Sequence, residues 1–112
     1  MVKVKFPYRW TEMGGIDITF IFTEDGSRVE PISIERSGTG RHGTDVYELS
    51  PGTYYVAWFR RSNGHNKPIR VLLKRLIIYD EGLFRVDAIE ENELPQPVLV
   101  KVRAIYNKLA DY

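Results

Sequence analysis

The segment from Leu49 to Arg61 carries the clearest pattern of apolar positions in the chain. It opens with Pro51-Gly52, which suits a type II turn because proline sets the first φ and glycine accepts a positive second φ. Aromatic and β-branched residues follow and alternate between two faces of the expected strand. One face would carry Tyr54, Val56 and Trp58, and the other Tyr55, Ala57 and Phe59. A strand that is apolar on both faces predicts a position inside a sheet, covered on both sides.

Shorter segments of alternating apolar and polar residues predict further strands on either side. They span residues 2–6, 16–23, 29–34, 45–49, 69–79 and 83–89. Pro7 is expected to end the first strand, and Asp25-Gly26 predicts a tight hairpin turn after the second. Pro31 cannot donate to a ladder, so the third strand is expected at an edge or at a bulge.

Residues 98–112 fit two templates. As a strand, the residues facing inward together would be Val98, Val100, Val102 and Ala104; as a helix, the residues on one apolar arc would be Val98, Val102, Ile105, Tyr106 and Leu109. Fifteen residues without a turn signal are long for a strand and usual for a helix, so the length favours the helix. The fold class expected is mainly β, a sandwich or curved antiparallel sheet of about seven strands with one C-terminal helix.

The composition narrows the class of protein. The 112 residues predict a single domain, residues 1–112, and the net charge of +1 gives no global field for an acidic partner. The lack of cysteine excludes disulfides and thiolate metal sites. An apolar signal core and a membrane-length apolar run are both missing from the sequence, so an intracellular, soluble protein is expected. Two methionines and a single glutamine favour a thermophilic source.

The segment from Asp25 to Arg61 resembles the carboxypeptidase-regulatory, transthyretin-like group of β-sandwich domains. The residues that carry the resemblance are Asp25-Gly26, Val29-x-Pro31-Ile32-x-Ile34, Thr44-Asp45 and Leu49-x-Pro51-Gly52-x-Tyr54-x-Val56. It covers about a third of the chain. The resemblance implies a sandwich fold and a role that is usually non-catalytic, and it carries over no functional residue.

A glycine-rich segment matches the G-x-G-x-x-G pattern. Its candidate anion-binding residues are Gly38, Gly40, Arg41, His42 and Gly43. A dinucleotide site would need a helix after the pattern, and here strands flank it. Backbone N–H groups beside Arg41 and His42 would still suit an anion, while a flexible loop is the plainer interpretation. The two histidines, His42 and His65, lack the short spacing of metal ligands, so neither a metal nor a cofactor is expected.

A basic run offers the alternative hypothesis of nucleic-acid binding. It comprises Arg60, Arg61, Lys67, Arg70, Lys74 and Arg75, and the sequence has no acid between Leu49 and Tyr79. If Trp58, Tyr54 or Tyr55 were exposed beside these cations, the rings would stack on bases while the cations contact phosphates. The plainer interpretation is that these aromatic residues belong to the core and the cations lie on the outward faces of two strands. Strand alternation places Arg60 and Arg61 on opposite faces, and Lys74 and Arg75 likewise, so three or four of the six are expected to act together.

The sequence lacks a nucleophile elbow and every other catalytic motif considered, which predicts a protein that is not an enzyme. The leading interpretation is a non-catalytic interaction or assembly module that acts through strand edges and an aromatic surface. Its partner would be a second copy or another protein, and nucleic acid is the alternative partner. A membrane partner is not expected.

Overall fold

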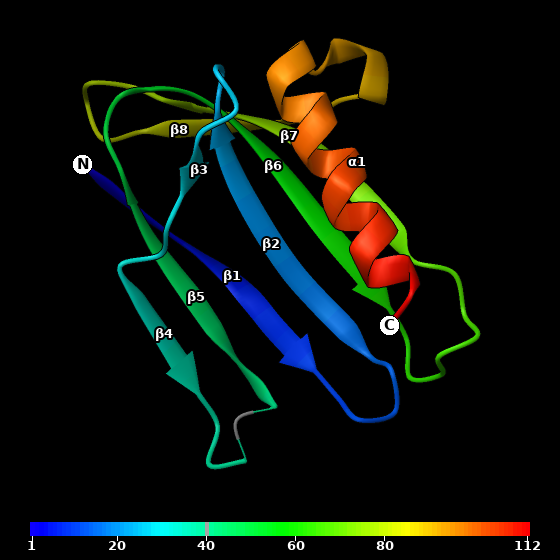
Figure 1. Ribbon diagram of the computed structural model, residues 1–112. Helices are drawn as coiled ribbons and strands as arrows, with labels where there is room; N and C mark the ends of the chain where they lie inside the picture. Colours follow the sequence, from blue (N-terminus) through cyan, green and yellow to red (C-terminus); the bar gives the residue numbers. More distant parts are fainter. Residues whose placement is uncertain (40) are drawn as a thin grey trace.

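Eight antiparallel strands form one open sheet in the computed structural model, which describes residues 1–39 and 41–112 (Figure 1). The order across the sheet is β4-β5-β1-β2-β6-β7-β8, and β3 pairs with β2 beside this path. The strands are β1 (Val2–Trp10), β2 (Ile16–Thr23), β3 (Arg28–Val29), β4 (Ser33–Arg36), β5 (His42–Leu49), β6 (Gly52–Arg61), β7 (Arg70–Ile78) and β8 (Phe84–Ala88). The mainly β class is therefore confirmed, with one strand more than expected.

Strand β6 lies between β2 and β7, which confirms the central position predicted for it. Gly52 takes a positive φ as expected, but at 151° it is far more extended than the roughly 80° of the type II turn predicted, and it already belongs to β6. Its two faces enter two separate apolar clusters. Tyr55, Ala57 and Phe59 pack beneath the helix, and Tyr54 and Val56 pack on the opposite face.

Helix α1 (Gln96–Ala110) covers the first of these faces, so residues 98–112 are mostly helix, as their length favoured (Figure 1). A short 3-10 helix, η1 (Glu91–Glu93), leads into it. Pro97 stands in the first turn, where its missing N–H costs no helical bond. Of the arc predicted from the sequence, Val98, Val102 and Leu109 are buried, whereas Ile105 is half-buried and Tyr106 is 39% exposed. No helix of the residues described has the length and apolar run that crossing a bilayer requires.

Pro7 acts differently from expectation, and Pro31 acts partly as expected. Pro7 does not end β1. At Pro7 the strand pairs with β5 alone, since β2 pairs only with Arg9 and Trp10, so the missing N–H of the proline leaves no bond to β2 unmade. Pro31 divides the expected third strand into two. β3 lies against β2, while β4 lies against β5 at an edge of the sheet. The edge position predicted from Pro31 is therefore confirmed for β4.

The first half of β1 diverges from β2 and closes over the face opposite the helix. Val2 and Val4 pack there with Ile21, Tyr47 and other residues of the second cluster. Tyr47 is fully buried, and its hydroxyl donates to the Thr19 carbonyl at 3.3 Å. Burial raises the pKa of Tyr47 to about 12, so the phenol is a neutral donor over the whole physiological range. The curved sheet therefore has apolar packing at one end of this face and polar residues at the other.

Candidate nucleic-acid interface

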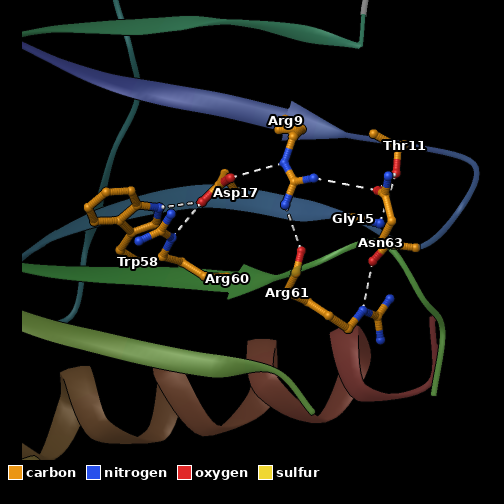
Figure 2. Close-up of polar contacts among 9 residues, drawn as sticks. Arg9, Thr11, Gly15, Asp17, Trp58, Arg60, Arg61 and Asn63 are labelled. Carbon is orange, nitrogen blue, oxygen red and sulfur yellow. Dashed lines mark hydrogen bonds and ion pairs between the residues drawn. The ribbon is translucent and has the colours of Figure 1, made fainter. Parts of the chain in front are cut away.

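Asp17 lies at the centre of the polar end of this face. Its Oδ2 accepts a hydrogen bond from Arg9 Nε at 3.1 Å, and its Oδ1 accepts from Trp58 Nε1 at 3.2 Å and Arg60 Nε at 2.8 Å (Figure 2). The three donors come from β1 and β6, the two strands that flank Asp17 on β2. One carboxylate therefore fixes the position of two guanidinium groups and an indole ring.

A hollow of about 320 Å³ opens beside this network, and we name it the arginine hollow. It is lined by Arg9, Arg60, Arg61, Ser62, Lys67, Pro68 and Arg70. Lys67 and Arg70 are exposed, and the Arg60 side chain is 49% exposed. Several like charges around one concavity create a local positive potential that the net charge of +1 does not reveal.

A second hollow of about 250 Å³, the lysine hollow, lies between β1 and the β7–β8 pair. It is lined by Lys3, Val4, Lys5, Phe6, Val56, Lys74, Leu76, Phe84 and Val86. Lys3, Lys5 and Lys74 bring positive charge, while the remaining side chains are apolar. The lysine hollow therefore suits a ligand with both anionic and apolar or aromatic parts.

Trp58 stands on β6 between Arg60, which lines the arginine hollow, and Val56, which lines the lysine hollow, and we name Trp58 together with the two hollows the basic trough. On β6 and β7 the paired positions run from Arg60↔Arg70 through Trp58↔Leu72 to Val56↔Lys74, all on one face. The guanidinium carbon of Arg60 lies 4.6 Å from the centroid of the Trp58 ring, and Lys74 Nζ lies 5.5 Å from it. A half-buried aromatic ring thus has a cation from each hollow close to it, and positions 60 and 56 of β6, which line the two hollows, are about 13 Å apart.

The structure brings together part of the predicted basic cluster. Arg60, Lys67 and Arg70 line the arginine hollow, and Lys74 lines the lysine hollow. Arg75 lies on the opposite face, because it pairs with Tyr55 on β6 and its guanidinium contacts Asp87 at 3.8 Å.

Arg61 is a structural residue, although its atoms also line the arginine hollow. It is 3% exposed, and its Nε donates to the Gly14 carbonyl at 2.7 Å. Its guanidinium lies 5.4 Å from the Tyr112 ring, on the helix side of the sheet. The alternation expected from the sequence therefore separates Arg61 and Arg75 from the side chains of the trough.

Three further cations of the trough, Arg9, Lys3 and Lys5, were not predicted. They stand on β1, more than forty residues before the basic run. The pairing of β1 with β2 brings Arg9 to the arginine hollow, and the first half of β1, which diverges from β2, brings Lys3 and Lys5 to the lysine hollow. The alternation of Lys3 and Lys5 with valines was visible in the sequence, but it identified only an outward face. The tertiary position of that face was the missing information.

The loop formed by the glycine-rich segment is shorter than predicted. His42 and Gly43 belong to β5, and a Cβ on Gly43 would lie 1.9 Å from the Glu35 carbonyl oxygen, so close strand packing explains this glycine. Arg41 Nη2 contacts Glu12 Oε1 at 3.3 Å. Gly38 has open space around it, and Gly40 lies outside the described residues. An anion-binding role for these residues stays a prediction.

The two histidines do not meet a set of metal ligands in the described part of the chain. Both ring nitrogens of His65 contact main-chain oxygens at 2.9 Å, those of Glu12 and Tyr112. This arrangement joins the β1–β2 loop and the β6–β7 loop to the end of the helical segment. His65 is therefore occupied by structural contacts.

A third hollow, of about 450 Å³, lies on the helix side of the sheet between α1 and β7. Val71, Leu73 and Val102 form its apolar floor, and Arg103 meets Glu91 at 2.6 Å at its rim. Glu90 also lines it. The carboxylates in this lining make it a poorer place for a phosphate than the basic trough.

No family model and no curated protein sequence matches the chain. Two solved structures of ORF157 from Acidianus filamentous virus 1 have a similar fold. The variant with a glutamate replaced by alanine has a TM-score of 0.68 at 18% identity, covering 91% of this chain and 74% of the viral chain. The variant with a lysine replaced by alanine also has a TM-score of 0.68, at 15% identity, covering 98% of this chain and 75% of the viral chain.

An engineered protein of known crystal structure is also similar, with a TM-score of 0.60 at 15% identity, covering 92% of this chain and 74% of that protein. At these identities the likeness shows the fold alone, a mainly β architecture. The resemblance of residues 25–61 to transthyretin-like domains stays a prediction, because neither a family match nor these structures bear on it.

Proposed function

We propose that the protein binds single-stranded nucleic acid along the basic trough. The observation that carries this proposal is the position of Trp58, whose ring lies close to Arg60 of the arginine hollow and to Lys74 of the lysine hollow. Proteins that bind single strands combine a positive groove for the phosphates with an aromatic ring on which a base stacks. A base within a duplex cannot reach such a ring, so the proposal specifies single strands.

The contacts of Trp58 indicate which side chain gives way to a base. Arg60 is tied to Asp17 by a 2.8 Å hydrogen bond, whereas Lys74 Nζ makes the longer contact with the ring, at 5.5 Å. Lys74 also has the more flexible side chain and the more strongly hydrated charge. A stacked base is therefore expected to displace Lys74, whose ammonium then pairs with an adjacent phosphate.

The test measures affinity for a mixed-sequence single-stranded oligonucleotide at several salt concentrations. Three or four phosphate contacts predict a slope of log affinity against log salt of about −2 to −3. Arg70→Gln and Lys74→Gln should each weaken binding and flatten the slope. Arg75→Gln is the matched control, since it removes the same charge from the same strand on the opposite face.

Fluorescence provides the second measurement. Trp58 emission should be quenched on binding, and the quenching should disappear in Trp58→Phe, because Trp10 is packed against Tyr112 at 4.2 Å between ring centroids and stays in place. Affinity that ignores Arg70→Gln and Lys74→Gln, or that falls equally in Arg75→Gln, would overturn the proposal.

Exposed apolar residues at the two edges of the sheet support a second candidate, an interaction or assembly module. Ile32 and Ile34 are exposed at β4, and Leu83, Phe84 and Val86 at β8. An edge strand offers unpaired backbone groups to another chain, and exposed apolar side chains add burial on pairing. Light scattering over a range of concentrations tests this candidate, and a monomer at every concentration would count against self-association. Neither proposal includes a catalytic step.

A further inference from the structure

Strand β8 ends the sheet, with β7 as its neighbour on one side. Phe84 is 52% exposed and Val86 is 45% exposed, and both lie on the face that carries the basic trough. Arg85 and Asp87 lie on the opposite face. The strand thus presents an apolar row on one face and two opposite charges on the other.

The ladder with β7 determines which backbone groups of β8 point outward. The Tyr79 N–H donates to the Leu83 carbonyl, and the Ile89 N–H donates to the Leu73 carbonyl. Hydrogen-bonded and non-hydrogen-bonded pairs alternate along an antiparallel ladder. Arg85 and Asp87 therefore direct their backbone groups toward β7, whereas Phe84, Val86 and Ala88 direct theirs away from the sheet.

These groups restrict how a second copy could pair with the edge. A two-fold axis must set outward-directed residues opposite one another. Axes that pair more than one such residue of β8 pass through Arg85, Val86 or Asp87. The first sets arginine against arginine, and the third sets aspartate against aspartate, both of which are destabilising. An axis at Val86 sets Arg85 opposite the partner's Asp87, twice by symmetry.

We propose that two copies of the chain pair through β8 in antiparallel orientation, with the two-fold axis at Val86. Phe84, Val86 and Ala88 would then form about six ladder hydrogen bonds with the partner subunit. Proteins that protect an edge use like charges, often lysine, which repel a second copy. The opposite charges at Arg85 and Asp87 instead make this edge self-complementary.

Two observations favour β8 over the β4 edge. Arg85 and Asp87 contact each other at 2.8 Å along β8, but their side chains are 58% and 30% exposed, so each can exchange this contact for one with the partner subunit. On β4, Arg36 is held by Asp45 at 3.1 Å, and these side chains are only 27% and 9% exposed. An edge of five residues buries less than the roughly 1,200 Å² of a stable interface, so the dimer is transient and depends on concentration.

This pairing identifies a second copy of the chain as the partner of the proposed assembly module, so it rests on that second candidate function. It does not depend on nucleic-acid binding. It would also affect the trough. Phe84 and Val86 line the lysine hollow, so an axis at Val86 would bring the lysine hollows of the two copies close to each other. A single strand longer than one trough would then reach both copies.

The experiment is a charge-reversal cycle, with the dimer measured by sedimentation equilibrium in the absence of nucleic acid. Arg85→Asp and Asp87→Arg should each weaken the dimer at least tenfold, and the double variant should restore it. Arg103→Asp, which breaks an exposed ion pair on α1, is the matched control and should leave the dimer unchanged. Amide hydrogen exchange at Val86 should slow as concentration rises, while exchange at Arg85 should not change.

The outcomes separate the pairing from the wider assembly role. A dimer that is insensitive to both single reversals, or a double variant that is not restored, would overturn the β8 pairing and place self-association elsewhere. A monomer at every concentration would overturn the pairing and self-association together.

Discussion

Asp17 and Trp58 are joined across β2 and β6 by a 3.2 Å hydrogen bond from the indole Nε1 to the carboxylate. Asp17 is only 13% exposed in its side chain and also accepts from Arg9 and Arg60. Asp17 thus reduces the positive charge of the trough and at the same time fixes the positions of the Trp58 ring and the two guanidinium groups.

Replacement of Asp17 by alanine should therefore lower the free energy of unfolding, by about 2 kcal/mol, because hydrogen bonds to a charged acceptor are lost and partly buried donors remain. Denaturant unfolding measures this change. Asp80→Ala, at an exposed position, is the control and should stay within about 0.5 kcal/mol of the wild type. Equal stability in the two variants would contradict the role assigned to Asp17.

Arg61 and Arg60 are neighbours in sequence but should respond to substitution in different ways. Arg61→Ala removes a buried guanidinium that holds the Gly14 carbonyl, so a loss of about 3 kcal/mol in stability is expected. Arg60→Ala should cost less stability and should weaken binding to the oligonucleotide. Thermal unfolding and the binding assay together separate the two effects, and a reversed order would be inconsistent with the structure.

Gly15 packs against the loop that borders the arginine hollow. A Cβ at this position would lie 2.3 Å from Asn63 Oδ1 and 2.7 Å from Arg9 Nη1 (Figure 2). Gly15→Ala should destabilise the protein by about 1 kcal/mol, because the side-chain ends that it meets must move and lose a hydrogen bond to one another. Gly38→Ala is the matched control, since that Cβ would meet no atom within 4 Å. Calorimetry of both variants tests the difference.

Phe59 is fully buried beneath α1, where it meets Phe20 edge to face at 5.8 Å. Phe59→Ala should lower the free energy of unfolding by about 3–5 kcal/mol. Phe84→Ala removes the same side chain from an exposed edge and should change stability by less than about 0.5 kcal/mol at low protein concentration. A small effect of Phe59→Ala in chemical denaturation would contradict the central position of β6.

Asp25 stabilises its hairpin in a pH-dependent way. Hydrogen bonds from the Thr23 hydroxyl and from Ser27 lower the pKa of Asp25 to about 2, below the value of about 3.9 expected in an unfolded chain. The stabilisation is complete above the unfolded value and is lost as pH falls through the folded value. Asp25→Asn should be less stable than the wild type above pH 4, and the difference should shrink toward pH 2. Glu24→Gln, in the same turn, serves as the control during acid titration.

Elements set by local residues were predictable from the sequence. The positive φ of Gly52, the two faces of β6 and most of the apolar arc of α1 each follow from neighbouring residue types. The course of β1 beyond Pro7 was not predictable in this way. A proline is tolerated there because β2 is absent from that part of the ladder, which is a property of the whole sheet.

In the candidate site too, features set by neighbouring residues were predictable, and features set by strand pairing were not. Alternation correctly separated Arg60 from Arg61, since period-two geometry is local. The convergence of Arg9 with Arg60 on Asp17 required the pairing of β1 with β2 and of β2 with β6. Trp58 was recognised as an aromatic residue near cations, but only the fold placed it between Arg60 and Lys74.

The strand order has a consequence for synthesis on the ribosome. β1 finds its long partner only when β5 has been made, with Val2 opposite Leu49, and β2 waits for β6, with Ile16 opposite Arg61. α1, which covers one face, is made after all of these strands. The first half of the nascent chain therefore carries apolar strands whose partners do not yet exist. Non-local pairing of this kind is slow, on the order of milliseconds to seconds, and the sheet is expected to complete its folding only after β6 and α1 have left the exit tunnel.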